Sequence, residues 1–284
     1  MKIPDNTKIQ SIDLKIIDMK TSLHFYSELL GFKKIHSDDN EVLLSATGKL
    51  PYLLKLVDDK NSKIRNKNST GMYHVAFKFK NRKELARVFM RLFNNKVKFQ
   101  GFTDHLVSET IYLADPDGNG VELYADKPKG QWERKMGQVV MDSLPLDLSI
   151  LTNELDDPEV WNGIDKETDI GHIHLNVSDL LKAEKFYNHI LEFNISNAFY
   201  PGAMFFSAGD YHHHIGTNIW FSKNSQPNSE NILGLINYTI KIPDKDFLNS
   251  IKVRAKENDF FIEELNETDF YIVDFDKNKI KLVM

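Results

Sequence analysis

The chain has 284 residues, of which 41% are hydrophobic and 27% charged, a composition typical of a soluble globular protein with about two domains. Its formal net charge of −5 argues against nucleic acid as a main partner, because phosphate recognition requires a basic surface. The absence of cysteine excludes disulfides and thiolate metal sites, so any metal must be held by histidine and carboxylate.

The first half of the chain shows the same order of predicted elements twice. Loose alternation predicts a strand at residues 12–17. Apolar residues at helical spacing from Leu23 to Leu30 predict a helix that Asp18 or Thr21 could cap and that Gly31 ends. The elements that follow are strands 41–45 and 52–57, strand 73–80, helix 83–93, and strands 110–113 and 120–124 around a turn at 115–120.

A connector and two further runs of the same kind complete the chain. Residues 127–168 combine proline, glycine and an acidic stretch, which indicates a connector with short structure. The elements predicted after it are strand 172–177, helix 181–191, strands 204–207 and 213–221, strand 236–242, helix 246–257, and strands 270–273 and 279–283.

The two halves repeat each other. The segment from Asp13 to Tyr26 matches the segment from His174 to Tyr187 at an offset of 161 (174 − 13), and Tyr112–Leu123 matches Tyr271–Leu282 at an offset of 159 (271 − 112). We therefore expect two homologous halves, each made of two βαβββ modules, and an α+β fold class.

Three strings in these modules carry a family resemblance: Gly71–Phe77, Asp115–Tyr124 and Gly171–Asp179. The chain resembles the vicinal oxygen chelate superfamily, which contains glyoxalases, bleomycin resistance proteins and extradiol dioxygenases. The resemblance implies four βαβββ modules in two paired-module, barrel-like domains. These would be 8–126 with modules one and two, and 169–284 with modules three and four, joined by 127–168.

Further strings resemble the bacterial catechol 2,3-dioxygenase-like branch: Asp104–Glu109, the ten-residue step from Tyr112 to Glu122, and Tyr211–Gly216. This resemblance implies an extradiol dioxygenase that opens a catechol-type aromatic diol with O2. Two alternatives share the fold. One is a glyoxalase-type isomerase or lyase, which usually needs four protein ligands. The other is a non-catalytic small-molecule-binding resistance protein.

The resemblance also implies a metal site, because ligands in this superfamily come from the first and last strands of paired modules. The matching positions are His74, Glu122 and His174, with His172 as a fallback ligand or substrate contact. Two histidines and one carboxylate are typical of non-haem Fe(II) oxygenases, so Fe(II) is expected before Mn(II), Zn(II) or Ni(II). These three residues meet only if module two pairs with module three, and we expect that pairing.

A second set of matching positions lies in modules one and four, at Asp13, Tyr238 and Lys281. A lysine at a ligand position would place a cation against a cation, so we expect this second cup to hold no metal.

The resemblance implies catalytic side chains around the metal. An acid/base histidine is expected at His213, with His212 and His214 as alternates, while His105 and Tyr112 would hydrogen-bond the substrate oxygens. Less strongly supported lining residues are Phe205, Asn218 and Trp220.

Localisation and assembly are predicted from simpler features. The apolar runs fall short of the roughly 20 residues that span a bilayer, and no apolar segment follows Met1, so we expect a cytoplasmic protein without a membrane partner. A homo-oligomer is compatible with the sequence, because paired sheets of this kind leave edge strands.

Overall fold

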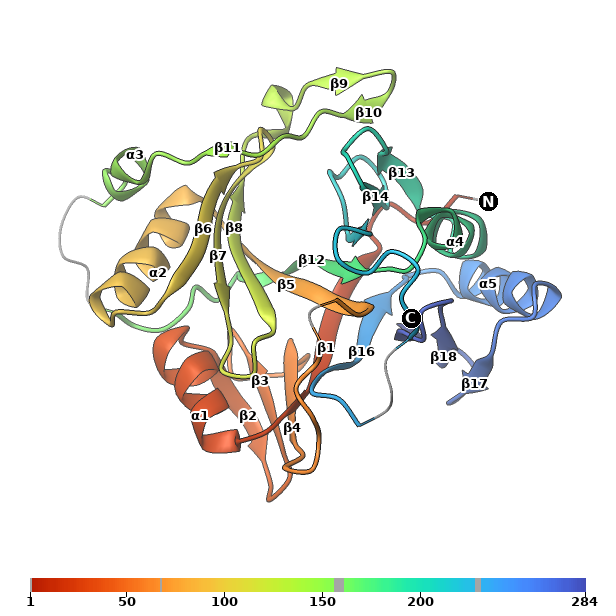
Figure 1. The fold of residues 1–284 in the computed structure, drawn as a ribbon, viewed down its shortest axis with the longest axis horizontal. Coiled ribbons are helices and arrows are strands. Elements are labelled where there is room, and N and C mark those ends of the chain that lie inside the picture. Colours follow the sequence, from red (N-terminus) through yellow and green to blue (C-terminus); the bar gives the residue numbers. More distant parts are fainter. Residues whose placement is uncertain (1, 67, 156–160, 228–230) are drawn as a thin grey trace.

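The computed structural model describes residues 2–66, 68–155, 161–227 and 231–284. It contains four modules with the predicted order of one strand, one helix and three strands (Figure 1). Module one comprises β1 (Lys8–Ile16), α1 (Met19–Leu23) with its π-helical continuation η1 (His24–Leu29), β2 (Lys33–Ser37), β3 (Glu41–Ser45) and β4 (Leu54–Asp58). Module two comprises β5 (Gly71–Phe79), α2 (Arg82–Asn94), β6 (Phe99–Asp104), β7 (Ser108–Ala114) and β8 (Gly120–Asp126).

The second half repeats this plan. Module three comprises β12 (Asp169–Asn176), α4 (Leu180–Glu184) with η3 (Lys185–Ile190), β13 (Asn194–Asn197), β14 (Ala203–Ser207) and β15 (Ile215–Asn218). Module four comprises β16 (Gly234–Lys241), α5 (Lys245–Glu257), β17 (Ile262–Glu264), β18 (Phe270–Val273) and β19 (Lys279–Val283). The connector holds η2 (Lys129–Gln131), β9 (Arg134–Lys135), β10 (Gln138–Val139), β11 (Leu144–Pro145) and α3 (Leu148–Thr152), so the expected short structure is present.

Two large curled sheets are built from these modules, and each sheet draws on both halves of the chain (Figure 1). The nine-stranded sheet has the order β11-β6-β7-β8-β5-β12-β15-β14-β13, so module two pairs with module three through antiparallel β5 and β12. The eight-stranded sheet has the order β17-β18-β19-β16-β1-β4-β3-β2, so module one pairs with module four through β1 and β16. The pairing of modules two and three expected from the ligand positions is confirmed, while the domain boundaries 8–126, 127–168 and 169–284 stay a prediction.

Each module starts its helix in the same way. The side chain of the residue before the helix, Asp18, Asn81, Asp179 or Asp244, accepts a hydrogen bond from a backbone N–H of the first turn. This is ordinary N-capping, which satisfies a donor that the helix itself leaves without a partner. The caps provide a fixed point in each module from which positions on the first strand can be compared.

Two buried hydrogen bonds join the sheets. The hydroxyl of Tyr26 donates to Oδ2 of Asp115 at 2.9 Å, and the hydroxyl of Tyr187 donates to Oδ2 of Asp274 at 2.9 Å. Each bond links a residue of one sheet's module to the last turn of the other sheet's module. Because both ends are buried, these bonds fix how the two sheets sit against each other.

The structure differs from the predicted elements in three places. The sequence did not predict the second strand of any module, namely β2, β6, β13 and β17. The helix of module three begins one residue earlier than predicted, at Leu180, while the helix of module one begins at Met19, directly after Asp18, one of its two candidate caps. The strand predicted at 213–221 is shorter and starts at Ile215, so the three consecutive histidines lie in the turn before it. Among the described helices, none combines the length and apolar character that crossing a bilayer requires.

Candidate metal centre

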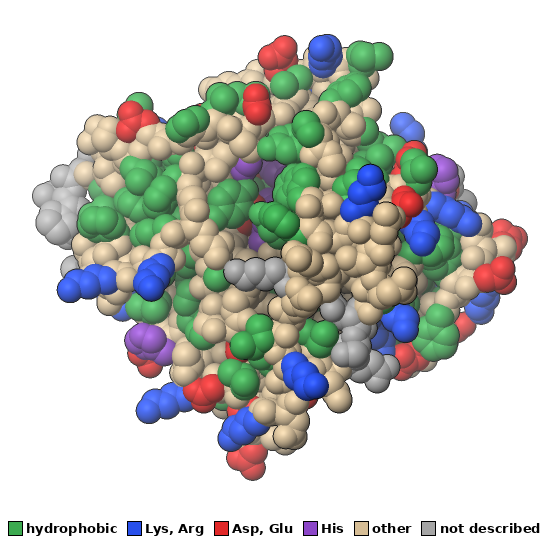
Figure 2. All heavy atoms as spheres, viewed as in Figure 1, with side chains coloured by type: hydrophobic (Ala, Val, Ile, Leu, Met, Phe, Trp, Pro, Cys, Tyr) green, Lys and Arg blue, Asp and Glu red, His purple; other side chains and the backbone are tan. Residues whose placement is uncertain are grey.

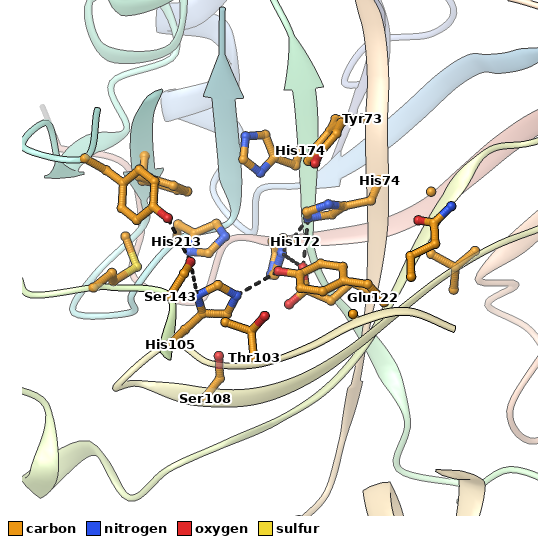
Figure 3. A pocket seen from close by; sticks show the side chains of 18 of the residues that line it. Tyr73, His74, Thr103, His105, Ser108, Glu122, Ser143, His172, His174 and His213 are labelled. Atoms are coloured by element: carbon orange, nitrogen blue, oxygen red, sulfur yellow. Dashed lines mark hydrogen bonds and ion pairs between the residues drawn. The ribbon is translucent and has the colours of Figure 1, made fainter. Parts of the chain in front are cut away.

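A cavity of about 360 Å³ lies against the nine-stranded sheet, lined by residues of modules two and three and of the connector. In the face of the molecule shown in Figure 2, a hollow near the centre exposes histidine atoms at its bottom and hydrophobic side chains around its mouth. Five histidines line the cavity: His74, His105, His172, His174 and His213. Figure 3 shows how the polar side chains lie in it.

Three side chains meet at one point in this cavity (Figure 3). Oε2 of Glu122 lies 2.9 Å from Nε2 of His74 and 3.2 Å from Nε2 of His172, and the two Nε2 atoms lie 3.3 Å apart. All three residues are buried, with 1–4% of each exposed. Two predicted ligands, His74 and Glu122, are therefore in contact, and the third member of the cluster is His172.

The position of His172 follows from the regular spacing of the modules. His74 lies seven residues before the helix cap Asn81 (81 − 74), and His172 lies seven residues before the helix cap Asp179 (179 − 172). His174 is only five residues before that cap. Counting from the caps therefore identifies His172 as the residue of module three that is equivalent to His74. The comparison of the two halves at an offset of 161 did not use this spacing.

The carboxylate is held so that one oxygen faces the imidazoles. Oγ1 of Thr110 donates to Oε1 of Glu122 at 3.1 Å, which leaves Oε2 directed at His74 and His172. Burial alone would raise the pKa of Glu122, but the neighbouring imidazoles of His172 and His74 hold it well below its usual range. Burial lowers the pKa of His172 to about 4, so its ring is neutral and available as a ligand at physiological pH.

This arrangement fits a divalent metal ion. Donor atoms about 2.1 Å from one ion and about 90° apart around it would lie roughly 3.0 Å from each other. The observed separations of 2.9, 3.2 and 3.3 Å are close to that value. Neutral nitrogen and carboxylate oxygen donors suit Fe(II), Mn(II) and Zn(II), and the identity of the ion is not fixed by this set alone.

The predicted ligand His174 lies beside this cluster, and among the described residues it is not one of the cluster's members. It pairs with His74 across β12 and β5, and the two ring centroids are 4.9 Å apart. Its Nε2 atom is buried and makes no hydrogen bond to any described residue. Gly216, opposite His174 on β15, leaves room for this ring, because a Cβ there would lie 3.0 Å from two of its atoms.

The three consecutive histidines point in different directions. The ring of His213 lines the cavity and stacks on His172 with centroids 4.0 Å apart. His212 points away, toward Asp126, with Nε2 of the histidine 3.0 Å from Oδ1 of the carboxylate. Nδ1 of His214 accepts a hydrogen bond from the backbone N–H of Ala208. Of the three, only His213 lines the cavity within the described chain.

His105 and Tyr112 form a pair on the opposite wall. Nε2 of His105 lies 2.7 Å from the hydroxyl of Tyr112, and Nδ1 of His105 lies 2.7 Å from the carbonyl oxygen of Asp142. Since a carbonyl oxygen only accepts, Nδ1 carries hydrogen, and the neutral ring then accepts at Nε2 from the tyrosine. Burial raises the pKa of Tyr112 well above its usual value, so this hydroxyl stays protonated.

Four aromatic side chains form part of the remaining cavity wall. Tyr73, Tyr200, Phe205 and Trp220 line it, together with Met141 and Ser143 of the connector. Phe205 and Trp220 were expected, whereas the predicted Asn218 is not part of the lining and instead accepts from the backbone of Trp220. The connector residues were not predicted, because only the folded chain brings residues 141 and 143 to this site.

The second cup has a different chemistry. Asp13 accepts hydrogen bonds from the hydroxyl of Tyr52 at 3.0 Å and from Nδ2 of Asn237 at 2.9 Å. Tyr238, which was expected beside Asp13, is fully buried with its hydroxyl 3.1 Å from that of Tyr187. Asn237 takes the place beside Asp13 because it, and not Tyr238, is the residue paired with Asp13 across β1 and β16.

Comparison with known proteins shows the family to which this chain belongs. The profile of the Glyoxalase/Bleomycin resistance protein/Dioxygenase superfamily matches residues 8–123 and 169–227, and the chain belongs to this superfamily. A Bacillus subtilis (strain 168) protein named catechol-2,3-dioxygenase is 39% identical over 274 residues, which cover 96% of this chain and 95% of that protein.

Solved structures share the fold at low sequence identity. A Bacillus subtilis (subsp. subtilis strain 168) protein, provisionally named a dioxygenase, has a TM-score of 0.67 at 12% identity and covers 100% of this chain and 86% of its own. Glyoxalase I from Zea mays has a TM-score of 0.58 at 14% identity and covers 98% of this chain and 92% of its own. These likenesses concern the fold.

Proposed function

We propose that the protein is a metal-dependent extradiol ring-cleaving dioxygenase that acts on a catechol-type aromatic diol and O2. The observation that carries this proposal is the cluster of His74, Glu122 and His172 at a cavity that also presents His213. Two histidines and one carboxylate leave coordination positions open on the metal, as in non-haem Fe(II) oxygenases. The 39% identity to a protein named catechol-2,3-dioxygenase supports the same activity here.

Fe(II) is the proposed ion, held by His74, Glu122 and His172. When bound, it would hold the two diol oxygens and O2 next to each other and let electrons pass from the diol, which is oxidised, to O2, which is reduced. Thr110 orients Glu122 from behind. Hydrogen-bonded partners of this kind fix the direction of a ligand and strengthen metal binding.

The other cavity residues have separate roles. The rings of Tyr73, Phe205 and Trp220 would hold a planar aromatic substrate. His213 would take a hydroxyl proton of the diol, because its ring lines the cavity and has a nitrogen that can accept it. Burial lowers the pKa of His213 well below its usual value, so the ring is neutral before the proton arrives. Tyr112 would stabilise negative charge on a substrate oxygen by turning toward it the hydroxyl hydrogen that it donates to His105 before substrate binds.

The charges of the cavity narrow the substrate. Among the described residues that line it, none is a lysine or an arginine, and Glu122 is the carboxylate of the metal cluster. A carboxylate on the substrate ring would be buried without a cationic partner, which is costly. We therefore expect catechol and alkyl catechols to be cleaved with a kcat/KM at least about tenfold above that of 3,4-dihydroxybenzoate.

The register of the strands argues against a glyoxalase-type centre with four ligands. Glu122 lies opposite Ala76 across parallel β5 and β8, two residues after His74. The corresponding position in module three is opposite His174, two residues after His172, and is occupied by Gly216. Glycine has no side chain to bind a metal, so the position in module three that is equivalent to Glu122 contributes no fourth ligand.

The proposal is tested by loading the protein with Fe(II) without oxygen, adding a catechol, and then admitting air. A yellow ring-opened product and stoichiometric O2 uptake are expected. Protein that binds Fe(II) but gives no such product with catechol, 3-methylcatechol and 4-methylcatechol would contradict the proposed activity. Parallel assays with a hemithioacetal and with Zn(II) or Ni(II) test the isomerase alternative directly.

A further inference from the structure

We propose that Asp126 and His212 are positioning residues that fix the tautomer of His213, so that its Nε2 atom faces the cavity without a hydrogen. The catalytic consequence of this inference rests on the proposed function, whereas the tautomer itself does not. The inference starts from a chain of hydrogen bonds that leads away from the cavity, from His213 to His212 and on to Asp126.

The distances in this chain are short. Nδ1 of His213 lies 2.7 Å from Nδ1 of His212, and Nε2 of His212 lies 3.0 Å from Oδ1 of Asp126. Both rings are buried, His212 with 0% and His213 with 7% exposed. Two imidazole nitrogens at this separation must share one hydrogen, so the protonation of one ring dictates that of the other.

The carboxylate of Asp126 decides where that hydrogen lies. An ionised carboxylate only accepts hydrogen bonds, so Nε2 of His212 must carry hydrogen. With that single hydrogen on His212, its Nδ1 is bare and accepts, so Nδ1 of His213 donates. Neutral His213 is left with a bare Nε2, the form that can take a proton from a substrate hydroxyl.

The surroundings keep Asp126 ionised and in place. Its oxygens accept from the hydroxyl of Tyr211 at 3.0 and 3.2 Å, and Nζ of Lys78 lies 4.0 Å from Oδ2. Burial would raise the pKa of Asp126, but its hydrogen bond with His212 and the charge of Lys78 hold it below its usual value. The ring of Trp132 packs against His212 with centroids 5.3 Å apart, which shields the contact from water.

No motif in the sequence marks this arrangement. Asp126 is the last residue of β8 in module two, and His212 lies in the turn before β15 of module three, 86 residues away (212 − 126). Only the pairing of modules two and three brings them together. Since Asp126 and His212 are absent from the cavity lining, they act on the reaction through His213.

The test is Asp126→Asn, which keeps the size of the side chain but lets its amide donate to Nε2 of His212. Long-range proton–nitrogen NMR of the metal-free wild-type protein should show His213 with hydrogen on Nδ1 only. In Asp126→Asn the tautomer with hydrogen on Nε2 should become populated. With Fe(II) bound, kcat should fall about 10–100-fold, with KM and metal content unchanged. His213 signals are identified by their loss in His213→Gln.

Two further variants separate positioning from simple damage. Asp126→Glu should restore the wild-type tautomer in part, because it restores the acceptor. Tyr211→Phe removes a hydrogen bond to the same carboxylate but leaves the contact with His212, and should keep the tautomer and a kcat within about threefold of wild type. Wild-type His213 with hydrogen on Nε2, or an Asp126→Asn protein with unchanged tautomer and kcat, would overturn the inference. A wild-type protein with the expected tautomer that cleaves no diol would instead overturn the proposed function.

Discussion

Each sheet has four equivalent positions, called corners below, two from each of its modules. The two sheets carry different types of residue at these corners. In each module the first corner lies on the first strand, seven residues before the helix cap. The second corner lies on the last strand, opposite the residue two places after the first corner. In the nine-stranded sheet these corners are His74, Glu122, His172 and Gly216. In the eight-stranded sheet they are Ser11, Lys55, Asn237 and Lys281.

The comparison shows that the backbone arrangement alone does not make a metal site. Lys55 and Lys281 take the place that Glu122 and Gly216 take in the other sheet, and they bring positive charge to Asp13. Burial raises the pKa of Asp13, the hydrogen bonds from Asn237 and Tyr52 oppose that rise most strongly, and the two lysines add to them. A divalent cation there would be repelled by two ammonium groups, so we expect metal to bind in the nine-stranded sheet in preference to this cup.

The largest expected effect comes from neutralising Glu122, and the matched control is neutralising Lys281 at the equivalent position of the other sheet. Glu122→Gln removes the only negative ligand of the described cluster, and we expect its affinity for Fe(II) or Mn(II) to fall by more than about 100-fold, since even loss of a supporting residue costs 10–100-fold. Lys281→Gln should leave affinity within about twofold. Isothermal titration or metal analysis after dialysis measures both. Equal losses in the two variants would contradict the assignment of a single centre.

The next effect decides between the two neighbouring histidines of β12. His172→Ala should lower metal affinity by more than about 100-fold, because its Nε2 is part of the cluster. His174→Ala should keep full metal stoichiometry and lose less than about tenfold in affinity. If His174→Ala lost more metal affinity than His172→Ala, His174 would be the third ligand and His172 a neighbour of the cluster.

Much of the fold was readable from the sequence, and the missed parts share a physical cause. The duplication and the helix and strand periodicities predicted four modules. Strands β3, β4 and β7 largely alternate between buried and less buried positions, while β1, β5 and β8 each contain a run of four or five buried residues. The second strand of module one, β2, is exposed or half-exposed at every position from Lys33 to Ser37 and lies at the edge of its sheet. An edge strand with little burial carries little alternation to detect.

The candidate site was readable only where a motif marks it. His74, Glu122, His105, Tyr112 and His213 lie in recognisable strings, and all five line the cavity. The choice between His172 and His174 was ambiguous because residues two apart on a strand face the same side. Asp126, Met141 and Ser143 could not be found, since contacts between distant segments depend on module pairing and on the path of the connector.

A smaller effect should appear in the pH dependence of stability, because buried histidines concentrate in the nine-stranded sheet. Burial lowers the pKa of His172 to about 4 and of His214 to about 3, while the unfolded value is about 6.5. Below pH 6.5 the unfolded chain therefore binds protons that the folded protein does not, and stability falls as pH falls. Each such histidine contributes about 1.4 kcal/mol per pH unit until the folded pKa is reached.

The measurement is the free energy of urea unfolding of metal-free protein at pH 7.5, 6.0 and 5.0. His214→Gln keeps an oxygen that can accept from Ala208 but cannot titrate. Its stability should therefore fall less steeply with pH, by about 1.4 kcal/mol per unit below pH 6.5. A variant with the wild-type slope would show that His214 is protonated in the folded protein.

The last two variants concern a feature that the two halves share, a buried hydrogen bond from a tyrosine to an aspartate. Tyr26→Phe and Tyr187→Phe each remove one buried hydrogen bond to a carboxylate, from Asp115 or from Asp274, and each should lower the free energy of unfolding by about 1.5–3 kcal/mol. Tyr187→Phe should cost the more, because its hydroxyl also lies 3.1 Å from that of Tyr238. Neither change touches the metal cluster, so metal stoichiometry should stay at the wild-type value. Urea unfolding with parallel metal analysis tests both points. If one variant lost metal while the other kept it, the hydrogen bond removed in the first would help to hold the metal centre. The two bonds would then not be equivalent contacts between the sheets.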